Sequence, residues 1–315
     1  MNDLDKRGGE AARAAWLYFH EQFTQSQIAD ELSVSRSTVT RLLQRAKDEG
    51  LVQITLNVTS GVFQTERELE RAYRLERVRI VPYANEDDTQ KRWLGHVAAD
   101  LMNGLVVDNS ITAVSWGTTM RAMTDWLVGQ QPRSDAQIVA LIGGLHNAAI
   151  GINTNEIARR LAQYFAAAVS LLLAPVYVQD EATAKGLIEN PGIRDALSLA
   201  RAASSVVYSL GAMHVDSTMF KLGHVSAEQK AYLEERGAVG DIACRWIDRD
   251  GYPVELPSSI NPIGIPLEDL KKIPHRLAVA GGDQKRDIVL AALRGGFSTM
   301  LVTDERTAAY LVAKR

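Results

Sequence analysis

The stretch LAVAGGDQKRDIVLAALRGGFSTMLVTD, residues Leu277–Asp304, decides the fold of most of this chain. It begins with an apolar run that ends at Gly281-Gly282, and it closes with a second apolar run, TMLVTD. The segment between them, KRDIVLAALRGG, has apolar residues at helical spacing. Two continuous apolar strands joined through one helix are typical of a parallel sheet that is covered on both faces.

The same pattern extends upstream to residue 77. The other strand-like runs are VRIVP, ITAVSW, IVALIGG, VSLLLAPVYV and VVYSLG, and the helical segments between them include TTMRAMTDWLVGQ and NEIARRLAQYFAAA. These alternations predict an α/β domain with a largely parallel sheet over residues 77–315. The stretch IACRWIDRDGYPVEL differs, because Asp250-Gly251 between short apolar runs predicts a β-hairpin.

The first 58 residues predict a separate helix-turn-helix domain. In FTQSQIADELSVSRSTVTRLLQRAKDEGLVQITLNV, Thr24 and Gln27 form a capping box, and Ser35 caps a second helix over Arg36–Glu49. Ala29 is small enough for the two helices to cross, and Ser33 occupies the turn position where glycine is common. The alternation in LVQITLNV predicts a half-buried strand, the wing of a winged helix-turn-helix.

The second of these helices has the character of a DNA-recognition helix. Residues 33–47 contain four basic side chains and no acid. We expect Ser37, Thr38 and Arg41 to contact base edges or phosphates, and Arg36, Arg45 and Lys47 to contact phosphates. The alternative is an amphipathic helical pair that binds another protein.

Composition limits what the domain can do alone. The chain has 315 residues and a net charge of −3, and residues 1–58 hold seven Lys and Arg against eight Asp and Glu. Without a global basic excess, we expect tight DNA binding to need two or more copies on one DNA.

Cys244 is the only cysteine, and the apolar run Tyr164–Val178 is too short for a membrane span, so we expect a cytoplasmic protein without membrane contact.

Residues 59–76 connect the two domains. The stretch SGVFQTERELERAYRLER has the apolar positions Leu69, Ala72 and Tyr73 among dense alternating charge, and we expect Thr65 to cap a linking helix. That helix either contacts a partner subunit or is a solvated helix with ion pairs between successive turns.

The residues that follow the predicted strands are the candidates for a ligand site. Ligands of open α/β sheets bind outside the carboxyl ends of the strands. There the chain has three glycine turns, Gly117-Thr118-Thr119, Gly143-Gly144 and Gly281-Gly282, the last followed by Lys285. Such turns bring backbone N–H groups and helix N-termini to a ligand, although each alone is also an ordinary strand-to-helix turn. We find no metal-ligand spacing and no nucleophile motif, and we expect neither a metal nor a cofactor.

At this point the chain resembles the SorC/DeoR family of bacterial sugar-responsive transcription regulators. The resemblance rests on the helix-turn-helix, SWGTT, IGG followed by NTNEIARRLA, GAVGDI with DRDGYPV, and AVAGGDQKRDIVLAALRGGFSTMLVTDE. It implies a Rossmann-like, sugar-isomerase-like domain used as a sensor, a tetramer that binds operator DNA, and a sugar, polyol or sugar phosphate as effector. The effector contacts that the resemblance implies are Gly117, Thr118, Thr119, Gly143, Gly144, Asn155, Asp241 and Lys285.

Two alternatives stay open. The chain is either a regulator or a phosphosugar isomerase or deaminase fused to a DNA-binding head, in which Asp241 and Lys285 act as base and electrophile. We favour the regulator because no convincing second acid or base lies near the glycine turns. The absence of an arginine fork leaves both a phosphate and a neutral polyol open as the ligand.

Overall fold

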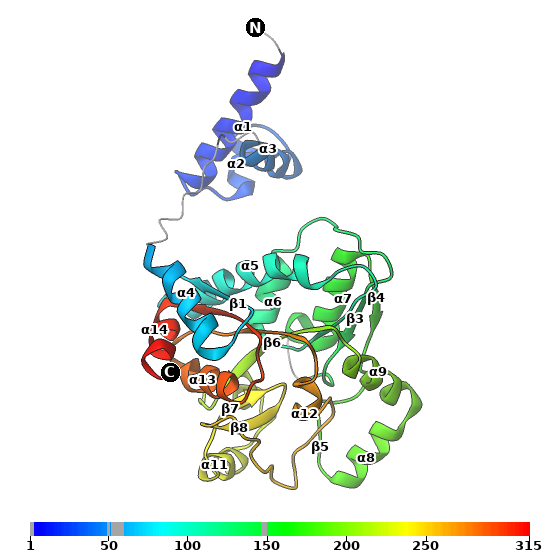
Figure 1. Cartoon of the computed structure of the whole chain (residues 1–315). Coiled ribbons are helices and arrows are strands. Elements are labelled where there is room, and N and C mark those ends of the chain that lie inside the picture. The colour runs from blue at the N-terminus through cyan, green and yellow to red at the C-terminus, as the bar shows by residue number, and fades with distance from the viewer. Residues whose placement is uncertain (1–2, 49–50, 52–59, 146–149) are drawn as a thin grey trace. The chain divides into compact units, whose positions relative to one another are not determined.

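The chain forms two compact units in a computed structural model that describes residues 3–48, 51, 60–145 and 150–315. The small unit comprises Met1–Thr59 and the large unit Ser60–Arg315. Figure 1 shows the small unit as three helices and the large unit as a sheet with helices on both faces.

The small unit is a three-helix bundle. Its helices are α1 (Asp3–Phe19), α2 (Gln25–Glu31) and α3 (Arg36–Asp48). The capping box at Thr24 and Gln27 forms, and the Ser35 hydroxyl accepts the Thr38 N–H at 3.2 Å, so both predicted N-caps are confirmed. Ser33 has a φ of 51°, the left-handed conformation expected in the turn. The first helix was not predicted.

The first helix completes the core of the small unit. Its buried residues Ala11, Ala14 and Ala15 pack against Ile28 and Ala29 of α2 and against the inner face of α3. The buried residues of that face are Val39, Leu42, Leu43 and Ala46. The predicted wing strand, residues 52–58, and the end of the second predicted helix at Glu49 lie outside the described residues.

The large unit alternates strands and helices along the chain. Its strands are β1 (Arg77–Val81), β2 (Ile111–Val114), β3 (Gln137–Ala140), β4 (Ala168–Ser170), β5 (Tyr177–Val178), β6 (Ser205–Ala212), β7 (Ala238–Ile242), β8 (Arg245–Asp248), β9 (Asn261–Pro262), β10 (His275–Val279) and β11 (Met300–Asp304). Its helices are α4 (Ser60–Tyr73), α5 (Asp87–Leu105), α6 (Thr118–Asp125), η1 (Ile150–Ile152), α7 (Thr154–Phe165), α8 (Glu181–Glu189), α9 (Pro191–Arg201), α10 (Thr218–Lys221), α11 (Ala227–Glu235), α12 (Leu267–Leu270), η2 (Asp283–Lys285), α13 (Arg286–Arg294) and α14 (Glu305–Ala313).

The central sheet is parallel over seven strands, in the order β1-β11-β10-β6-β2-β3-β4. Successive residues of one strand enter different cores: Val206 and Tyr208 pack on one face of the sheet, and Val207 packs on the other. One core includes α9, α13 and α14, and the other includes α5, α6 and α7. The predicted parallel sheet with both faces covered is therefore confirmed (Figure 1).

The chain reverses at Asp250-Gly251 as predicted, and it also makes an earlier antiparallel turn that was not predicted. Strands β7 and β8 pair antiparallel across Ala243 and Cys244, whose φ angles are 49° and 64°. Two consecutive positive φ angles give the tight reversal that matches the strand twist. At Asp250-Gly251 the chain does reverse, yet only a single bridge, Ile247 to Pro253, follows. The predicted run 169–178 also divides, because β4 joins the main sheet and β5 pairs with β9.

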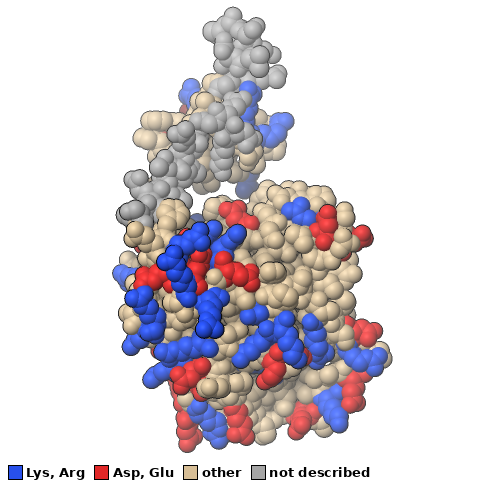
Figure 2. Space-filling model, in the orientation of Figure 1, with Lys and Arg blue, Asp and Glu red and all other residues tan. Residues whose placement is uncertain are grey.

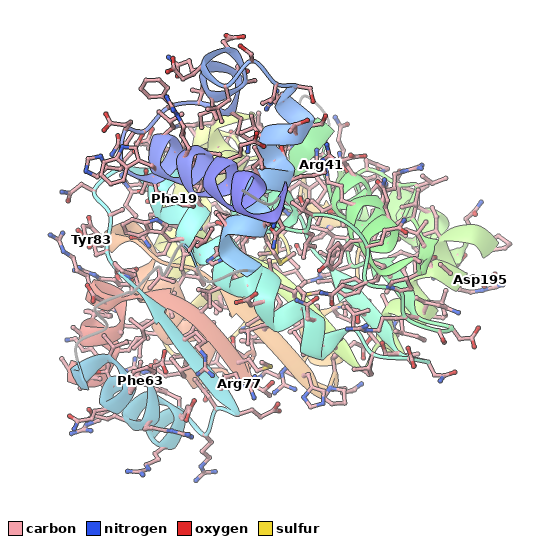
Figure 3. All side chains as sticks on the ribbon, turned by 90° about the horizontal axis from the view of Figure 1, so that it is seen from above. Phe19, Arg41, Phe63, Arg77, Tyr83 and Asp195 are labelled. Atoms are coloured by element: carbon pink, nitrogen blue, oxygen red, sulfur yellow. The ribbon has the colours of Figure 1, made fainter. Side chains whose placement is uncertain are left out.

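Helix α4 belongs to the large unit and packs along the edge strand β1. Leu69 is fully buried, and the Glu66 carboxylate accepts the Ile80 N–H at 3.0 Å. Figure 3 shows the helix that carries Phe63 beside the strand that begins at Arg77. The helix begins at Ser60, and the Thr65 hydroxyl donates to the Gly61 carbonyl inside it, so the expected cap at Thr65 is wrong. On its outer face, basic and acidic side chains such as Arg67, Arg71 and Glu68 are interleaved (Figure 2).

Candidate functional site: a central pocket and a helix for DNA

The large unit has a pocket at the carboxyl ends of β2, β6 and β10, called the central pocket below. Strand β2 leads to β3 on one side of the sheet, whereas β6 leads to β10 on the other, so the pocket lies where the strand order switches direction. Its cavity volume is about 100 Å³. Its lining includes Gly117, Thr118, Thr119, Asp241 and Lys285, which the sequence analysis selected.

The turn at Gly117 places the start of α6 against the pocket. Gly117 has a φ of 131°, and a Cβ atom at this position would lie 2.7 Å from the Ser209 hydroxyl. Only glycine therefore fits without strain. The first N–H groups of a helix have no partner within the helix, and here they start at Thr118 and Thr119. This arrangement offers hydrogen-bond donors and a positive helix end to a ligand.

Asp241 enters the pocket from β7 and is held by the hairpin turn. Its carboxylate accepts the Cys244 N–H at 2.9 Å, and its other oxygen lies over Gly211, where a Cβ atom would approach it to 1.8 Å. Burial raises the pKa of Asp241 to about 6, although the Cys244 hydrogen bond and the charge of Lys285 oppose the shift. The carboxylate is suited to accept hydrogen bonds from ligand hydroxyl groups.

Two lysines line the pocket from different elements. Lys285 ends η2 just before α13, and Lys91 lies in the first turns of α5. Loss of solvation, together with the positive charge of Lys91, lowers the pKa of Lys285 to about 8, while Asp87 and Asp241 oppose the shift. Lys91 forms an ion pair with Asp87, one turn earlier on the same helix.

Gly143, Gly144 and Asn155 do not line the central pocket. The Gly143 N–H donates to the Ile263 carbonyl, and Gly144 exchanges backbone hydrogen bonds with the 174–176 segment. A Cβ atom on Gly143 would lie 2.4 Å from the Pro175 carbonyl, so this glycine allows two backbones to pass. The Asn155 amide bonds the Leu172 backbone twice and ties α7 to the chain after β4. The Asn153 side chain caps the start of that helix.

Several lining residues were not selected from the sequence. They are Asp87 and Lys91 on α5, Ser209 and Gly211 at the end of β6, Asp216, Ser217 and Thr218 before and at the start of α10, and Gln284 beside Lys285. Asp87 and Lys91 are four residues apart, the spacing of an ordinary ion pair on a helix surface. This spacing therefore gave no indication that the two residues line a pocket. Ser209 and Gly211 lie in the last residues of a predicted strand, so the rule that ligands bind at strand ends was sufficient to select them.

Helix α3 presents the candidate DNA contacts. Arg36, Ser37 and Arg41 are exposed, whereas Thr38 and Arg45 are partly buried. The Thr38 hydroxyl bonds Ser35 at 2.9 Å and accepts from Arg41 at 3.3 Å, so it holds the start of the helix and orients the Arg41 guanidinium. Lys47 lies on the helix, but its side chain is outside the described residues. The Thr40 hydroxyl links α3 to Gln25 of α2.

No group of three or more His, Cys, Asp and Glu side chains in residues 3–48, 51, 60–145 and 150–315 is arranged to hold a metal ion. Within the same residues, no helix has the length and apolar character needed to cross a membrane.

Comparisons with known proteins define the class of protein. Residues 58–313 match a family model described as a "putative sugar-binding domain", and residues 9–54 match a "homeodomain-like domain". The sorbitol operon regulator SorC from Klebsiella pneumoniae, solved at full length, has the same fold over 99% of both chains, with a TM-score of 0.79 and 24% identity. A two-unit chain of this kind is a DNA-binding head joined to a ligand-binding domain.

The relatives narrow the class to one family. The chain is 31% identical to the transcriptional regulator LsrR of Klebsiella pneumoniae, over 96% of this chain and 92% of that protein. It is 32% identical to the deoxyribonucleoside regulator of Bacillus subtilis, over 95% of this chain and 96% of that protein. The chain therefore belongs to the SorC/DeoR family of sugar-binding transcriptional regulators. These relatives are regulators and not enzymes, which decides against the isomerase alternative.

Proposed function

We propose that this protein controls a carbohydrate or polyol catabolic operon, and that a sugar, polyol or sugar phosphate in the central pocket changes its affinity for operator DNA. One observation carries the proposal. Gly117, Thr118, Thr119, Asp241 and Lys285, which come from three separate stretches of the sequence, line a single pocket at the switch point of the sheet. Hydroxyl-accepting and anion-accepting groups face the same space there, as a sugar-type ligand requires.

The proposed DNA contacts are Arg36, Ser37, Thr38, Arg41, Arg45 and Lys47 on α3. Arg41 supports this role best, because its guanidinium is exposed and oriented by Thr38 near the start of the helix. Recognition helices read base edges with such N-terminal residues. The small unit has no basic excess, so we propose a cytoplasmic homo-oligomer, a tetramer, whose several heads bind one operator.

The proposed mechanism has two states. A ligand bound at the strand ends favours one packing of the subunits, and this packing sets the spacing of the recognition helices. A dimeric reader needs half-sites about 34 Å apart or at multiples of that distance, so a small rotation removes one half-site contact. The ligand must bind the two states with different affinity, because otherwise it shifts no equilibrium.

Two measurements test the proposal. Fluorescence anisotropy with the DNA upstream of the gene should show salt-dependent binding by the full chain, which Arg41→Ala weakens by about 1–3 kcal/mol. Arg13→Ala, an exposed arginine of α1 outside the recognition helix, is the matched control. A thermal-shift screen of sugars, polyols and their phosphates should identify a ligand that raises the melting temperature and changes DNA affinity. Turnover of any of these compounds, abolished by Asp241→Asn, would contradict a purely sensory pocket.

A further inference from the structure

Asp304, the last residue of β11, is fully buried and is not among the residues that line the central pocket. One oxygen of its carboxylate accepts the Gly282 N–H at 2.7 Å and the Thr307 hydroxyl at 2.6 Å. The other oxygen accepts the N–H groups of Arg306 at 2.9 Å and Thr307 at 3.1 Å. A buried carboxylate is costly unless hydrogen-bond donors replace its lost hydration, and these four donors do so.

The two oxygens of Asp304 serve different parts of the fold. The oxygen that accepts from the backbone of Arg306 and Thr307 caps the start of α14. Such a cap needs one oxygen only, which an asparagine or serine side chain supplies equally well. The second oxygen joins α14 to the turn after β10, because Gly282 lies at the start of η2. The cap alone therefore does not require a carboxylate at this position.

The turn after β10 brings Lys285 to the pocket. Gly282 has a φ of 96°, and its carbonyl accepts the Lys285 N–H at 2.9 Å. A Cβ atom on Gly281 would lie 2.6 Å from the Asp304 carboxylate, so glycine at this position lets the carboxylate reach the Gly282 N–H. Gly282 therefore connects the two residues, because its N–H is bound by Asp304 and its carbonyl binds the backbone of Lys285.

Asp304 acts on Lys285 through this backbone and not through its charge. The charges that act on the Lys285 ammonium are those of Lys91, Asp87 and Asp241. Each of these three groups lines the pocket, whereas Asp304 does not. A change at Asp304 therefore reaches the ammonium group only by moving the turn.

A second contact between α14 and the turn is exposed. Arg306 forms an ion pair with Asp283 at 3.4 Å, and 51% and 47% of these side chains are accessible. Asp283 also bonds Arg286, and solvent screens exposed pairs of this kind. The buried bond from Asp304 to Gly282 is therefore the main restraint that α14 places on the turn.

We propose that Asp304 is a positioning residue of the effector pocket, which fixes the Gly281-Gly282 turn through the Gly282 N–H and so places Lys285 at the lining. The inference rests on the proposed function, in which Lys285 contacts the effector. It adds a residue that does not itself reach the ligand. Releasing the turn should let the Lys285 side chain move into solvent while the large unit stays folded.

The test follows Lys285 directly in the full chain. Asp304→Asn keeps an oxygen that caps α14, but its amide group is a donor and cannot accept the Gly282 N–H. Reductive methylation with ¹³C-formaldehyde labels the lysines, and the signal that is absent from Lys285→Arg identifies Lys285 in a pH titration by NMR. The pKa of Lys285 should be about 8 in the unsubstituted protein and should rise toward its ordinary value of 10.5 in Asp304→Asn, because the released lysine regains solvent.

Thr307→Val is the matched control. It removes the hydroxyl that donates to the same carboxylate oxygen, but it keeps the Thr307 N–H and the bond from Asp304 to Gly282. The pKa of Lys285 should therefore stay at about 8. Gly281→Ala is a second variant, because its methyl group displaces the carboxylate from the turn. It should raise the pKa of Lys285 as Asp304→Asn does, and it decides alone if Asp304→Asn does not fold.

An unchanged pKa of Lys285 in Asp304→Asn and Gly281→Ala would overturn the inference. An equal rise in Thr307→Val would overturn it too, because any loosening of α14 would then release the lysine. The titration needs no ligand, so it is independent of the screen of sugars, polyols and their phosphates. If those compounds bind and the pKa of Lys285 does not move, the inference fails while the proposed function stands. If the pKa moves and none of them binds or changes DNA affinity, the proposed function fails, and with it the role of Asp304 in an effector pocket.

Discussion

The recognition helix and the central pocket hold their functional residues in opposite ways. On α3 the side chains of Arg36, Ser37 and Arg41 are exposed and project from a small core of alanines and aliphatic residues, so this core does not depend on them. In the pocket, Asp241 and Thr119 are buried, and glycines at 117 and 211 leave the space that their neighbours occupy. Substituting one exposed side chain of α3 should therefore change DNA specificity without unfolding the small unit. Substituting a buried pocket residue should also change the stability of the large unit.

The largest expected effect is in the core of the small unit. Ile28 is fully buried between α1, α2 and α3, and Ile28→Ala removes most of its side chain from a core that has few large residues. We expect a loss of about 2–5 kcal/mol, enough to unfold a unit of this size and abolish DNA binding. Circular dichroism should show a separate early transition with the melting of the large unit unchanged. A single transition lowered as a whole would show that the two units unfold together.

The next prediction tests whether the turn that forms the pocket also contributes to the stability of the large unit. Gly117→Ala places a methyl group 2.7 Å from the Ser209 hydroxyl and requires a φ of 131° of a residue with a side chain. We expect a loss of about 1–3 kcal/mol in the free energy of unfolding, with loss of effector binding. Gly186→Ala is the control, because this helical glycine has no atom near its Cβ position and alanine favours helix. Equal stability of the two variants would contradict the strain at the turn.

How far the sequence predicts this molecule depends on the kind of signal. Strands buried on both faces are continuous apolar runs, and those of the central sheet were located to within a few residues. Helix α1 was missed because its buried residues are alanines, which give little apolar contrast. The reversal at Asp250-Gly251 was predicted because Asp-Gly is a strong turn signal. The turn between β7 and β8 was missed because Ala243 and Cys244, which have positive φ angles there, are not typical turn residues.

The site was predictable only in part, for a related reason. A glycine after a strand indicates an unusual backbone conformation or a close approach by another group. The sequence does not show whether that group is a ligand or another segment of the chain. Gly117 opens the pocket, while Gly143 makes room for the Pro175 backbone. Lys91 was missed because the sequence indicates only a surface ion pair with Asp87. It lines the pocket because α5 follows the end of β1, which the sequence alone does not place next to the other strand ends.

The substitution Asp241→Asn should stabilise the protein at neutral pH, whereas most substitutions destabilise it. Because the pKa of Asp241 is raised in the folded protein from 3.8 to about 6, the folded state binds more protons than the unfolded chain between these pH values. The free energy of unfolding must therefore fall as the pH rises through that window, by about 3 kcal/mol in total. Asp241→Asn should remove this fall and stabilise the large unit at pH 7.5, while abolishing the response to effector.

The control for this pH profile is Asp195→Asn. Asp195 is an exposed residue of α9 with 74% of its side chain accessible, far from the lining of the pocket (Figure 3). Urea denaturation across pH 4 to 8 should give the same profile for this variant as for the unsubstituted protein. A profile for Asp241→Asn that still falls between pH 4 and 6 would show that another group carries the titration.

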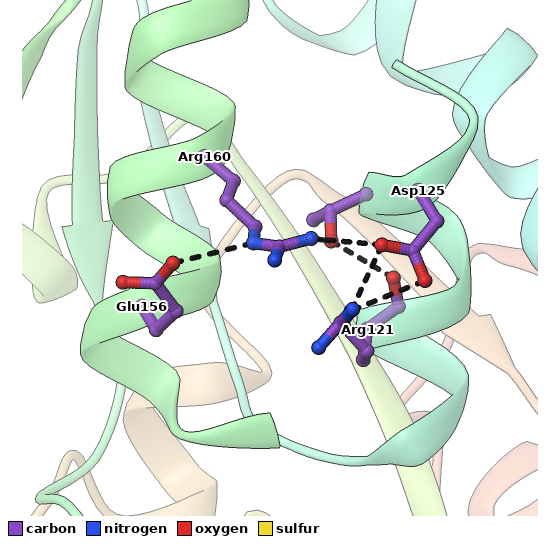
Figure 4. A network of polar contacts seen from close by, with 5 residues as sticks. Arg121, Asp125, Glu156 and Arg160 are labelled. Atoms are coloured by element: carbon purple, nitrogen blue, oxygen red, sulfur yellow. Dashed lines mark hydrogen bonds and ion pairs between the residues drawn. The ribbon is translucent and has the colours of Figure 1, made fainter. Parts of the chain in front are cut away.

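The smallest effect is expected where α6 and α7 meet beside the pocket. The Arg160 guanidinium bonds Asp125 at 2.8 Å and Glu156 at 3.3 Å, and Arg121 bonds Asp125 at 2.8 Å (Figure 4). These side chains are partly exposed, so solvent screens them, and Arg160→Ala should cost less than about 1 kcal/mol. A double-mutant cycle with Asp125→Ala in low and high salt measures the pair alone. A coupling above about 2 kcal/mol would mean that this network fixes α6, and with it the Gly117 turn, as firmly as the buried core does.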